Sequence, residues 1–185
     1  MENFVLKDLE PKSVYRFFEE MCRIPHGSGN TKAVSDWAVR FAKERGLPCR
    51  QDGMGNVVIW KKASPGYEDH PTAMIQGHLD MVCVKENGVE HDFEKDPLDL
   101  YIDGDWVKAR GTSLGSDDGI AVAMAMAVLD DDTIPHPPIE AVFTVDEEVG
   151  MPGASGLDCS DLKSRYLLNV DSEVEKVLTV GCAGG

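Results

Sequence analysis

The 185-residue chain contains no apolar run that approaches the roughly 20 residues needed to cross a membrane. Its first ten residues, MENFVLKDLE, lack the apolar core of a secretory signal. These two absences argue against a membrane protein and against a secreted one. We therefore expect a cytoplasmic protein with no membrane partner.

Basic residues are scarce: 18 Lys and Arg stand against 33 Asp and Glu, a formal net charge of −15. A surface of this charge repels phosphate backbones, and no basic cluster with interleaved aromatic residues offsets it. We therefore expect no nucleic-acid partner. The acidic surplus is typical of a solvated surface, and part of it can also gather at a site for cations.

Cysteines are few, odd in number and widely spaced, and no C-x-x-C pair occurs. They are Cys22, Cys49, Cys83, Cys159 and Cys182. The pattern argues against a disulfide framework and against a thiolate zinc site. A reducing cytosol is the simplest environment for such a chain.

What the chain does contain is an alternation of helix and strand patterns, with enough apolar residues (42%) for one good core. Helices are predicted over 11–24, from 30 or 31 to 46, and over 116–129. Strands are predicted at 48–52, 56–61, 72–76, 139–145, 166–170 and 177–180. A hairpin is predicted at 100–108. This order predicts an α/β fold with a mixed, mostly parallel sheet flanked by helices on both faces. In such folds, sites form at the carboxyl ends of strands.

Acidic and imidazole side chains lie where these strands end or where a helix begins. They are His78 and Asp80 after 72–76, Asp117 at the start of 116–129, Glu147 and Glu148 after 139–145, and Asp171 after 166–170. Zinc-class ions accept imidazole nitrogen and carboxylate oxygen, and catalytic sites keep a position for water. Together these junctions predict a metal site.

Individual residues of this set have alternative interpretations. Asp117 and Asp118 can simply cap the helix and complement its dipole. Adjacent Glu147 and Glu148 repel each other, and metal ions or a proton on one of them would relieve the repulsion. That suggests a division of labour in which one glutamate binds metal and the other moves the proton of a water. Asp80 is suitably spaced to accept the other ring N–H of His78.

A glycine-rich loop, P-H-G-S-G at 25–29, separates the first two predicted helices. It has two interpretations that the sequence does not separate. One is a flexible connector, and the other is a loop that faces the substrate.

Several motifs resemble those of the aminoacyl-histidine dipeptidases, also called Xaa-His dipeptidases or carnosinase-like enzymes, within the zinc aminopeptidase/aminoacylase superfamily. They are G-H-L-D-M-V (77–82), H-D-F-E-K-D-P-L (91–98), G-T-S-L-G-S-D-D-G-I (111–120), D-E-E-V-G-M (146–151), N-V-D-S-E (169–173) and G-C-A-G-G (181–185). The resemblance runs from the first helix to the last residue. It implies a zinc-exopeptidase-like three-layer sandwich.

The resemblance also implies a role for each residue. Asp117 matches the carboxylate that bridges two divalent metal ions, and the peptide after it is commonly cis. His78 and Asp171 match the other ligands of one ion, and Glu148 matches a ligand of the second. Glu147 matches the general base, and Asp80 the carboxylate that orients His78. The implied reaction is hydrolysis of a small peptide, an Xaa-His dipeptide, by a water shared between two ions. Zinc is expected, with manganese or cobalt as alternatives.

The family's second ion takes a further histidine that lies downstream, and none of His26, His70, His91 and His136 matches it. The family also has a lid or dimerisation domain after the region that resembles 181–185. We therefore expect residues 1–185 to be the N-terminal portion of a catalytic domain, truncated before the lid domain and the rest of the sheet. We further expect a homodimeric parent and little or no peptidase activity from this chain alone.

Two alternatives remain open. One is an N-acyl-amino-acid deacylase or an aminopeptidase built on the same metal core; the segment 91–98 favours the dipeptidase. The other is a non-catalytic metal-binding module, against which the presence of Glu147 and Asp80 argues.

Overall fold

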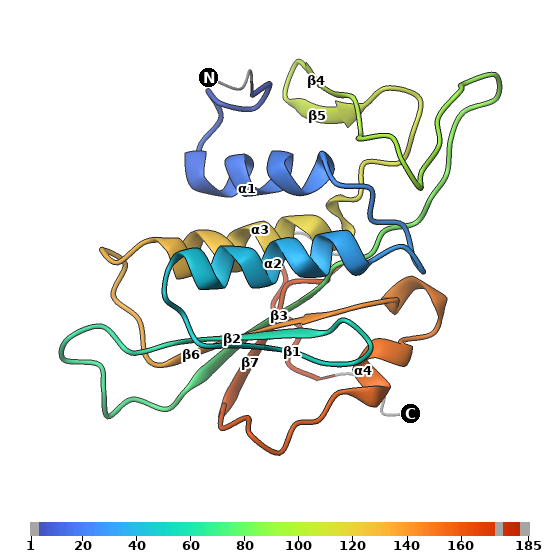
Figure 1. Ribbon diagram of the computed structural model, residues 1–185. Coiled ribbons are helices and arrows are strands. Elements are labelled where there is room, and N and C mark those ends of the chain that lie inside the picture. Colours follow the sequence, from blue (N-terminus) through green and yellow to red (C-terminus); the bar gives the residue numbers. More distant parts are fainter. Residues whose placement is uncertain (1–3, 173–175, 182–185) are drawn as a thin grey trace.

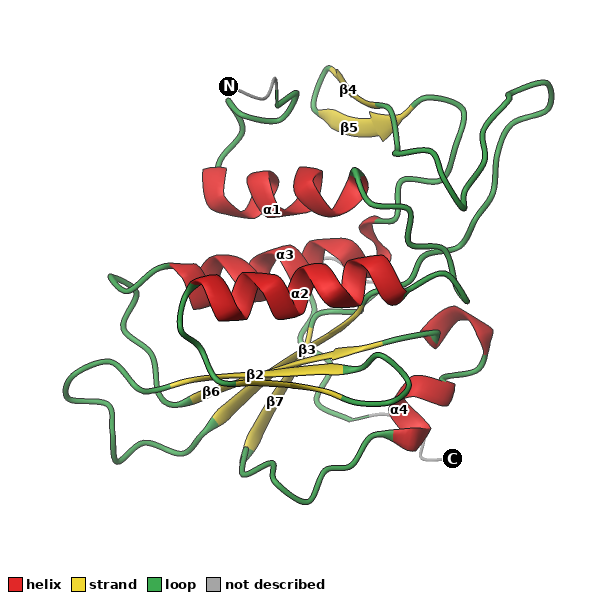
Figure 2. Ribbon diagram, viewed as in Figure 1, coloured by secondary structure: helices red, strands yellow, loops and turns green. Residues whose placement is uncertain are grey.

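The computed structural model describes residues 4–172 and 176–181, and its centre is a five-stranded mixed sheet (Figures 1 and 2). The strands are β1 (Cys49–Gln51), β2 (Val57–Lys61), β6 (Ile139–Thr144), β3 (Ala73–His78) and β7 (Tyr166–Asn169), in that spatial order. The first three are antiparallel neighbours, and β3 is parallel to both β6 and β7. The predicted mixed sheet with flanking helices is confirmed.

Three long helices lie on one side of this sheet (Figure 2). They are α1 (Lys12–Cys22), α2 (Lys32–Glu44) and α3 (Ser116–Asp130). Helix α3 packs against β3, α2 against β1 and β2, and α1 lies on α3. The predicted boundaries hold within a few residues, since Thr31 is the N-cap residue of α2 and Gly46, at φ 66°, follows its end. Burial of the apolar faces of these helices forms the core.

The other side of the sheet is covered by α4 (Pro152–Gly156) and the loop at 157–165 (Figure 1). Because side chains alternate along a strand, Glu140 points away from the core residue Ala141. Its buried carboxylate accepts hydrogen bonds from the backbone of Lys163 and Ser164 and from the Trp60 indole. This second covering layer is therefore mostly loop, and of the helices predicted on both faces it contains the short α4.

A separate hairpin, β4 (Leu100–Asp103) and β5 (Trp106–Ala109), lies beside α1 in Figure 1, where the sequence predicted a hairpin. Among the described residues, the helices are all too short or too polar to cross a membrane.

Two sequence predictions near the end of the chain are wrong. Residues 177–180 do not form a strand, and Leu178 and Val180 are 93% and 100% exposed. The four residues of β7 are also exposed, although the sequence suggested a buried strand before Asp171. Within the described residues β7 pairs with β3 alone, so it is an edge strand, and an apolar run is buried only where neighbours cover it. Residues 182–185, which include most of G-C-A-G-G, lie outside the described residues.

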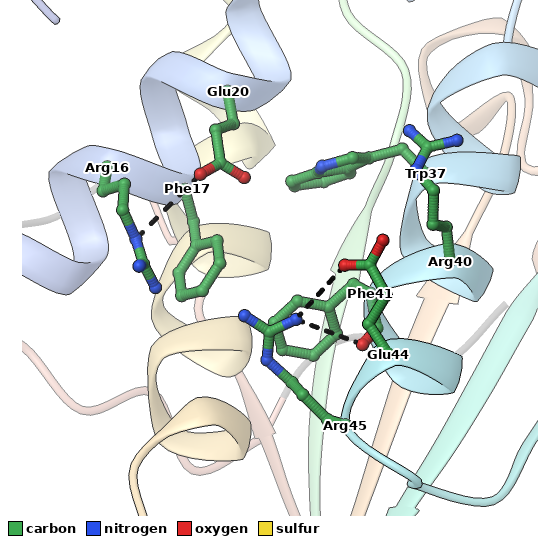
Figure 3. A pocket seen from close by; sticks show the side chains of 8 residues that line it. All are labelled: Arg16, Phe17, Glu20, Trp37, Arg40, Phe41, Glu44 and Arg45. Carbon is green, nitrogen blue, oxygen red and sulfur yellow. Dashed lines mark hydrogen bonds and ion pairs between the residues drawn. The ribbon is translucent and has the colours of Figure 1, made fainter. Parts of the chain in front are cut away.

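A pocket of about 290 Å³ lies between α1 and α2 (Figure 3). Two of its arginines are paired with one acid: Arg16 and Arg45 each lie 2.6 Å from a carboxylate oxygen of Asp130, at the C-terminal end of α3. Asp117 lies near the other end of this helix, so the pocket is separated from the predicted metal site by roughly 20 Å of helix at 1.5 Å per residue. Because these ion pairs join α1 and the end of α2 to α3, we assign the pocket to helix packing.

Candidate metal centre

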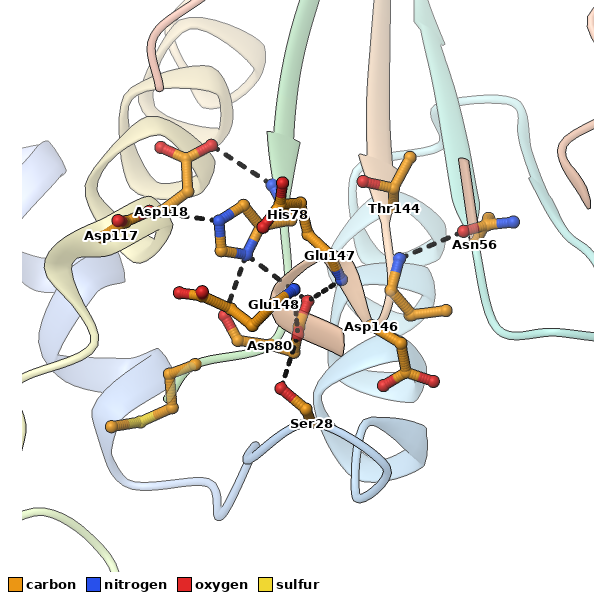
Figure 4. Close-up of polar contacts among 12 residues, drawn as sticks. Ser28, Asn56, His78, Asp80, Asp117, Asp118, Thr144, Asp146, Glu147 and Glu148 are labelled. Carbon is orange, nitrogen blue, oxygen red and sulfur yellow. Dashed lines mark hydrogen bonds and ion pairs between the residues drawn. The ribbon is translucent and has the colours of Figure 1, made fainter. Parts of the chain in front are cut away.

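The acidic and imidazole residues singled out in the sequence converge at one edge of the sheet (Figure 4). Strands β3 and β6 are parallel neighbours, so their carboxyl ends meet there. His78 is the last residue of β3, and the 3-10 turn Glu147–Val149 follows β6. Two groups of possible ligand atoms each lie within 4.8 Å of one another: His78, Asp117 and Glu148, and His78, Asp118 and Asp171.

The His78 ring is 1% exposed and is held on both sides. Its Nδ1 lies 3.0 Å from the backbone oxygen of Asp80 and 3.4 Å from the Asp80 carboxylate, whereas Nε2 lies 3.1 Å from Asp117 Oδ1. A proton on Nδ1 donated to Asp80 leaves Nε2 for a metal ion. Burial lowers the pKa of His78, but the hydrogen bond that its ring donates to Asp80 and the nearby negative charges outweigh this effect and raise the pKa to about 9.

Asp80 is fully buried and accepts hydrogen bonds from three directions. Its Oδ1 accepts from the Glu147 backbone N–H at 2.9 Å, and its Oδ2 from the Glu148 N–H at 3.3 Å and the Ser28 hydroxyl at 2.7 Å. Burial raises the pKa of this carboxyl, but the hydrogen bonds from His78, Glu147 and Ser28 dominate and lower it to about 2. Asp80 is thus an ionised support behind His78 and the Glu147–Glu148 turn.

Asp117 and Asp118 do not act as helix caps. Their φ/ψ values, −84°/106° and −111°/28°, are not helical, and the N-cap residue of α3 is Gly115, with no side-chain cap hydrogen bond. The peptide between the two aspartates is cis. The side chains separate: that of Asp117 is 70% exposed, whereas Asp118 is 2% exposed and accepts a hydrogen bond from the His78 backbone N–H at 3.2 Å.

Asp118 is a site residue that the sequence interpretation missed. Burial, with repulsion from Asp171 and Asp117, raises its pKa to about 7 against the opposing effect of His78. The signal that marks it is Gly77, because a Cβ atom there would lie 2.8 Å from Asp118 Oδ2. A glycine immediately before a strand-end histidine therefore leaves room for a buried carboxylate.

The chemistry of this set fits a divalent cation. Several carboxylates and one imidazole lie close together. Burial, together with repulsion from Asp117, raises the pKa of Glu148. A cation bound among them would relieve that repulsion. Imidazole nitrogen with carboxylate oxygen suits zinc, manganese or cobalt.

The segment that contains these residues is similar to known proteins. Residues 74–178, which contain all six residues predicted for the site, match the family model described as Peptidase family M20/M25/M40. The cytosol non-specific dipeptidase of Escherichia coli is 46% identical over 180 residues, which is 97% of this chain and 37% of that protein. The crystal structure of aminoacylhistidine dipeptidase from Vibrio alginolyticus is also 46% identical, with a TM-score of 0.89 over 92% of this chain and 35% of that one.

A more distant structure, a tripeptidase from Staphylococcus aureus, shares the fold at 23% identity, with a TM-score of 0.73 over 88% of this chain and 44% of that one. The chain spans little more than a third of the length of the two 46% identical relatives. Because the family match takes in more than half of the chain and the carboxylate site with it, the chain belongs to peptidase family M20/M25/M40.

Proposed function

We propose that the protein carrying this chain is a metal-dependent dipeptidase. The observation that carries the proposal is the convergence of His78 Nε2, Asp117 and Glu148 within 4.8 Å, with Asp80 bound behind the histidine. The names of the two 46% identical relatives, a cytosol non-specific dipeptidase and an aminoacylhistidine dipeptidase, support the substrate class. Dipeptides, including Xaa-His dipeptides, are therefore the substrates to test. We place the protein in the cytosol.

Each residue has a proposed role. Asp117, whose side chain is 70% exposed, would bridge two ions. His78 and Asp171 complete the ligands of one ion, and Glu148 binds the other. Asp118 lies in the same group as Asp171, but its carboxylate is occupied by the His78 backbone N–H, so we assign it to support.

The bound ions would supply an acidified water and a polarised peptide carbonyl. Glu147 takes a proton from that water at its carboxylate and delivers it to the leaving amine. Its backbone N–H donates to Asp80 Oδ1, so the same buried aspartate sets the position of the base and of the His78 ring.

The test uses the protein that carries this chain, in its natural full-length form. Metal is removed with a chelator, and hydrolysis of Xaa-His dipeptides, other dipeptides and N-acetyl amino acids is measured before and after zinc, manganese or cobalt is restored. We expect dipeptide hydrolysis only with metal. Glu147→Gln should lower kcat by roughly a hundredfold or more with bound metal unchanged.

Chelator-resistant hydrolysis would contradict the metal site. Hydrolysis of N-acetyl amino acids without dipeptides would favour a deacylase. The 185-residue chain assayed alone should show little or no turnover, and robust turnover would refute that prediction. The homodimer stays a prediction, to be tested by the mass of the same full-length protein in solution.

A further inference from the structure

The loop His26–Gly29, here termed the strap, runs alongside the chain that follows His78. The two segments pair through a bridge between Gly27 and Met81. The Met81 N–H donates to the His26 oxygen at 3.2 Å, and the Ser28 N–H donates to the Met81 oxygen at 3.3 Å. The strap is therefore attached to the segment that contains Asp80.

The strap has little freedom to move, contrary to the interpretation as a flexible connector. His26 is 2% exposed, and its Nδ1 lies 2.6 Å from the Ile24 backbone oxygen. A Cβ atom at Gly27 would lie 2.3 Å from Cys83 Sγ, so a larger residue there would require the Cys83 side chain to move. On the other side, the Gly29 N–H donates to Asp146 Oδ1 at 2.7 Å. These contacts fix where the Ser28 side chain lies.

Ser28 makes the shortest side-chain or backbone contact of the Asp80 carboxylate (Figure 4). Its hydroxyl donates to Oδ2 at 2.7 Å, compared with 2.9 Å from the Glu147 N–H, 3.3 Å from the Glu148 N–H and 3.4 Å to the His78 ring. Without this hydroxyl, the contact that remains to Oδ2 among these is the 3.3 Å hydrogen bond from the Glu148 N–H. The carboxylate can then rotate. Rotation would loosen the Glu147–Glu148 turn and the ring at once.

We propose that Ser28 is a positioning residue for the candidate metal centre. It acts through Asp80: the hydroxyl fixes the carboxylate plane, and the plane fixes the orientation of the His78 ring and of the amides of Glu147 and Glu148. The consequence for metal affinity rests on the proposed function. The consequence for the turn holds for the metal-free protein too.

The first measurement is amide hydrogen exchange of Glu147 and Glu148 in the metal-free 185-residue chain. Ser28→Ala should speed exchange at both amides by roughly fivefold to tenfold, because a charge-assisted hydrogen bond that supports their acceptor is lost. Ser28→Thr keeps a hydroxyl and should restore the wild-type rates. Ser113→Ala is the matched control, since it removes a hydroxyl that donates to the Val82 oxygen at 2.6 Å and leaves Asp80 untouched.

The second measurement is titration of the same variants with zinc and with manganese. Ser28→Ala should bind roughly threefold to tenfold more weakly, a smaller loss than the tenfold to hundredfold typical of groups that touch a metal ligand directly. Ser28→Thr and Ser113→Ala should match the wild type. If Ser28→Ala does not fold, Ser28→Cys takes its place, because a thiol is a weak donor.

Unchanged exchange at Glu147 and Glu148 in a folded Ser28→Ala variant would overturn the positioning role. Equal losses in Ser28→Thr and Ser28→Ala would overturn it as well. If the wild-type chain binds neither metal but Ser28→Ala still speeds exchange, the positioning role stands and the proposed metal site fails for this chain.

Discussion

The candidate metal centre has a buried half and an exposed half that are stabilised differently. The side chains of His78, Asp80 and Asp118 are 1%, 0% and 2% exposed, and protein donors and acceptors fix their positions. The Asp117 side chain is 70% exposed, and Glu148 belongs to a turn with no buried residue. The fold organises the buried half before any cation arrives, whereas the exposed half holds like charges close together. Asp80 and Asp118 thus serve to orient the site, whereas Asp117 and Glu148 supply charge for a cation.

The largest expected effect comes from breaking the buried half. Asp80→Asn replaces the carboxylate that accepts hydrogen bonds from Ser28, Glu147 and Glu148 with an amide. The NH2 group of that amide would face hydrogen-bond donors and could not accept from them. We expect a loss of about 3 kcal/mol in the unfolding free energy of the metal-free chain, since a buried ionic network loses its anion. Urea denaturation measures this, with Asp105→Asn, an exposed aspartate of the β4–β5 turn, as control. Equal stability of the two variants would show that the buried half does not organise the site.

The exposed half should behave in the opposite way. Asp117→Asn should leave the metal-free unfolding free energy within about 0.5 kcal/mol, as for other exposed substitutions. Metal binding should fall by about a hundredfold or more, because a bridging carboxylate loses its charge. Glu147→Gln is the matched control and should keep metal affinity within about threefold, since a proton-moving group is not a ligand. Similar affinities of the two variants in titration calorimetry would show that the roles are wrongly assigned.

The sequence predicted most residues of the candidate metal centre and missed one. His78, Asp117, Glu147 and Glu148 follow or precede strong apolar patterns, so the junctions were visible and the structure brings them to one edge. The burial of Asp118 beside His78 was not visible, because backbone angles decide which of two adjacent carboxylates points inward.

The contact of Ser28 with Asp80 spans 52 residues of sequence, and no local pattern predicts a contact of that separation. The strand predicted at 166–170 forms but is exposed, and the strand predicted at 177–180 does not form, for a related reason. Apolar runs predict burial, but burial depends on neighbours, and β7 has only β3 beside it in the described part of the sheet.

Two buried histidines offer a comparison within the metal-free chain. Burial lowers the pKa of His26, whereas the carboxylates around His78 raise its pKa to about 9. In an NMR titration of the ring protons, His78 should stay protonated through neutral pH, while His26 should titrate below the usual value of about 6.5. The stability from protonated His78 is complete below about pH 6.5 and is lost as the pH rises through about 9. Titration of both rings near 6.5 would contradict the electrostatics of the buried half.

The smallest expected effect lies at the border between the halves. Asp146 adopts a left-handed conformation at φ 57°, and its carboxylate holds the strap through the Gly29 N–H. Asp146→Asn keeps an acceptor and a residue type that tolerates this conformation, so stability should change by less than about 0.5 kcal/mol. Asp146→Ala loses both and should cost about 1–2 kcal/mol in thermal or urea unfolding. If both variants were neutral, the strap would be held without Asp146. If both variants weakened metal binding, this aspartate's charge would belong to the exposed half, and the D-E-E segment would contribute three charges to the site in place of two.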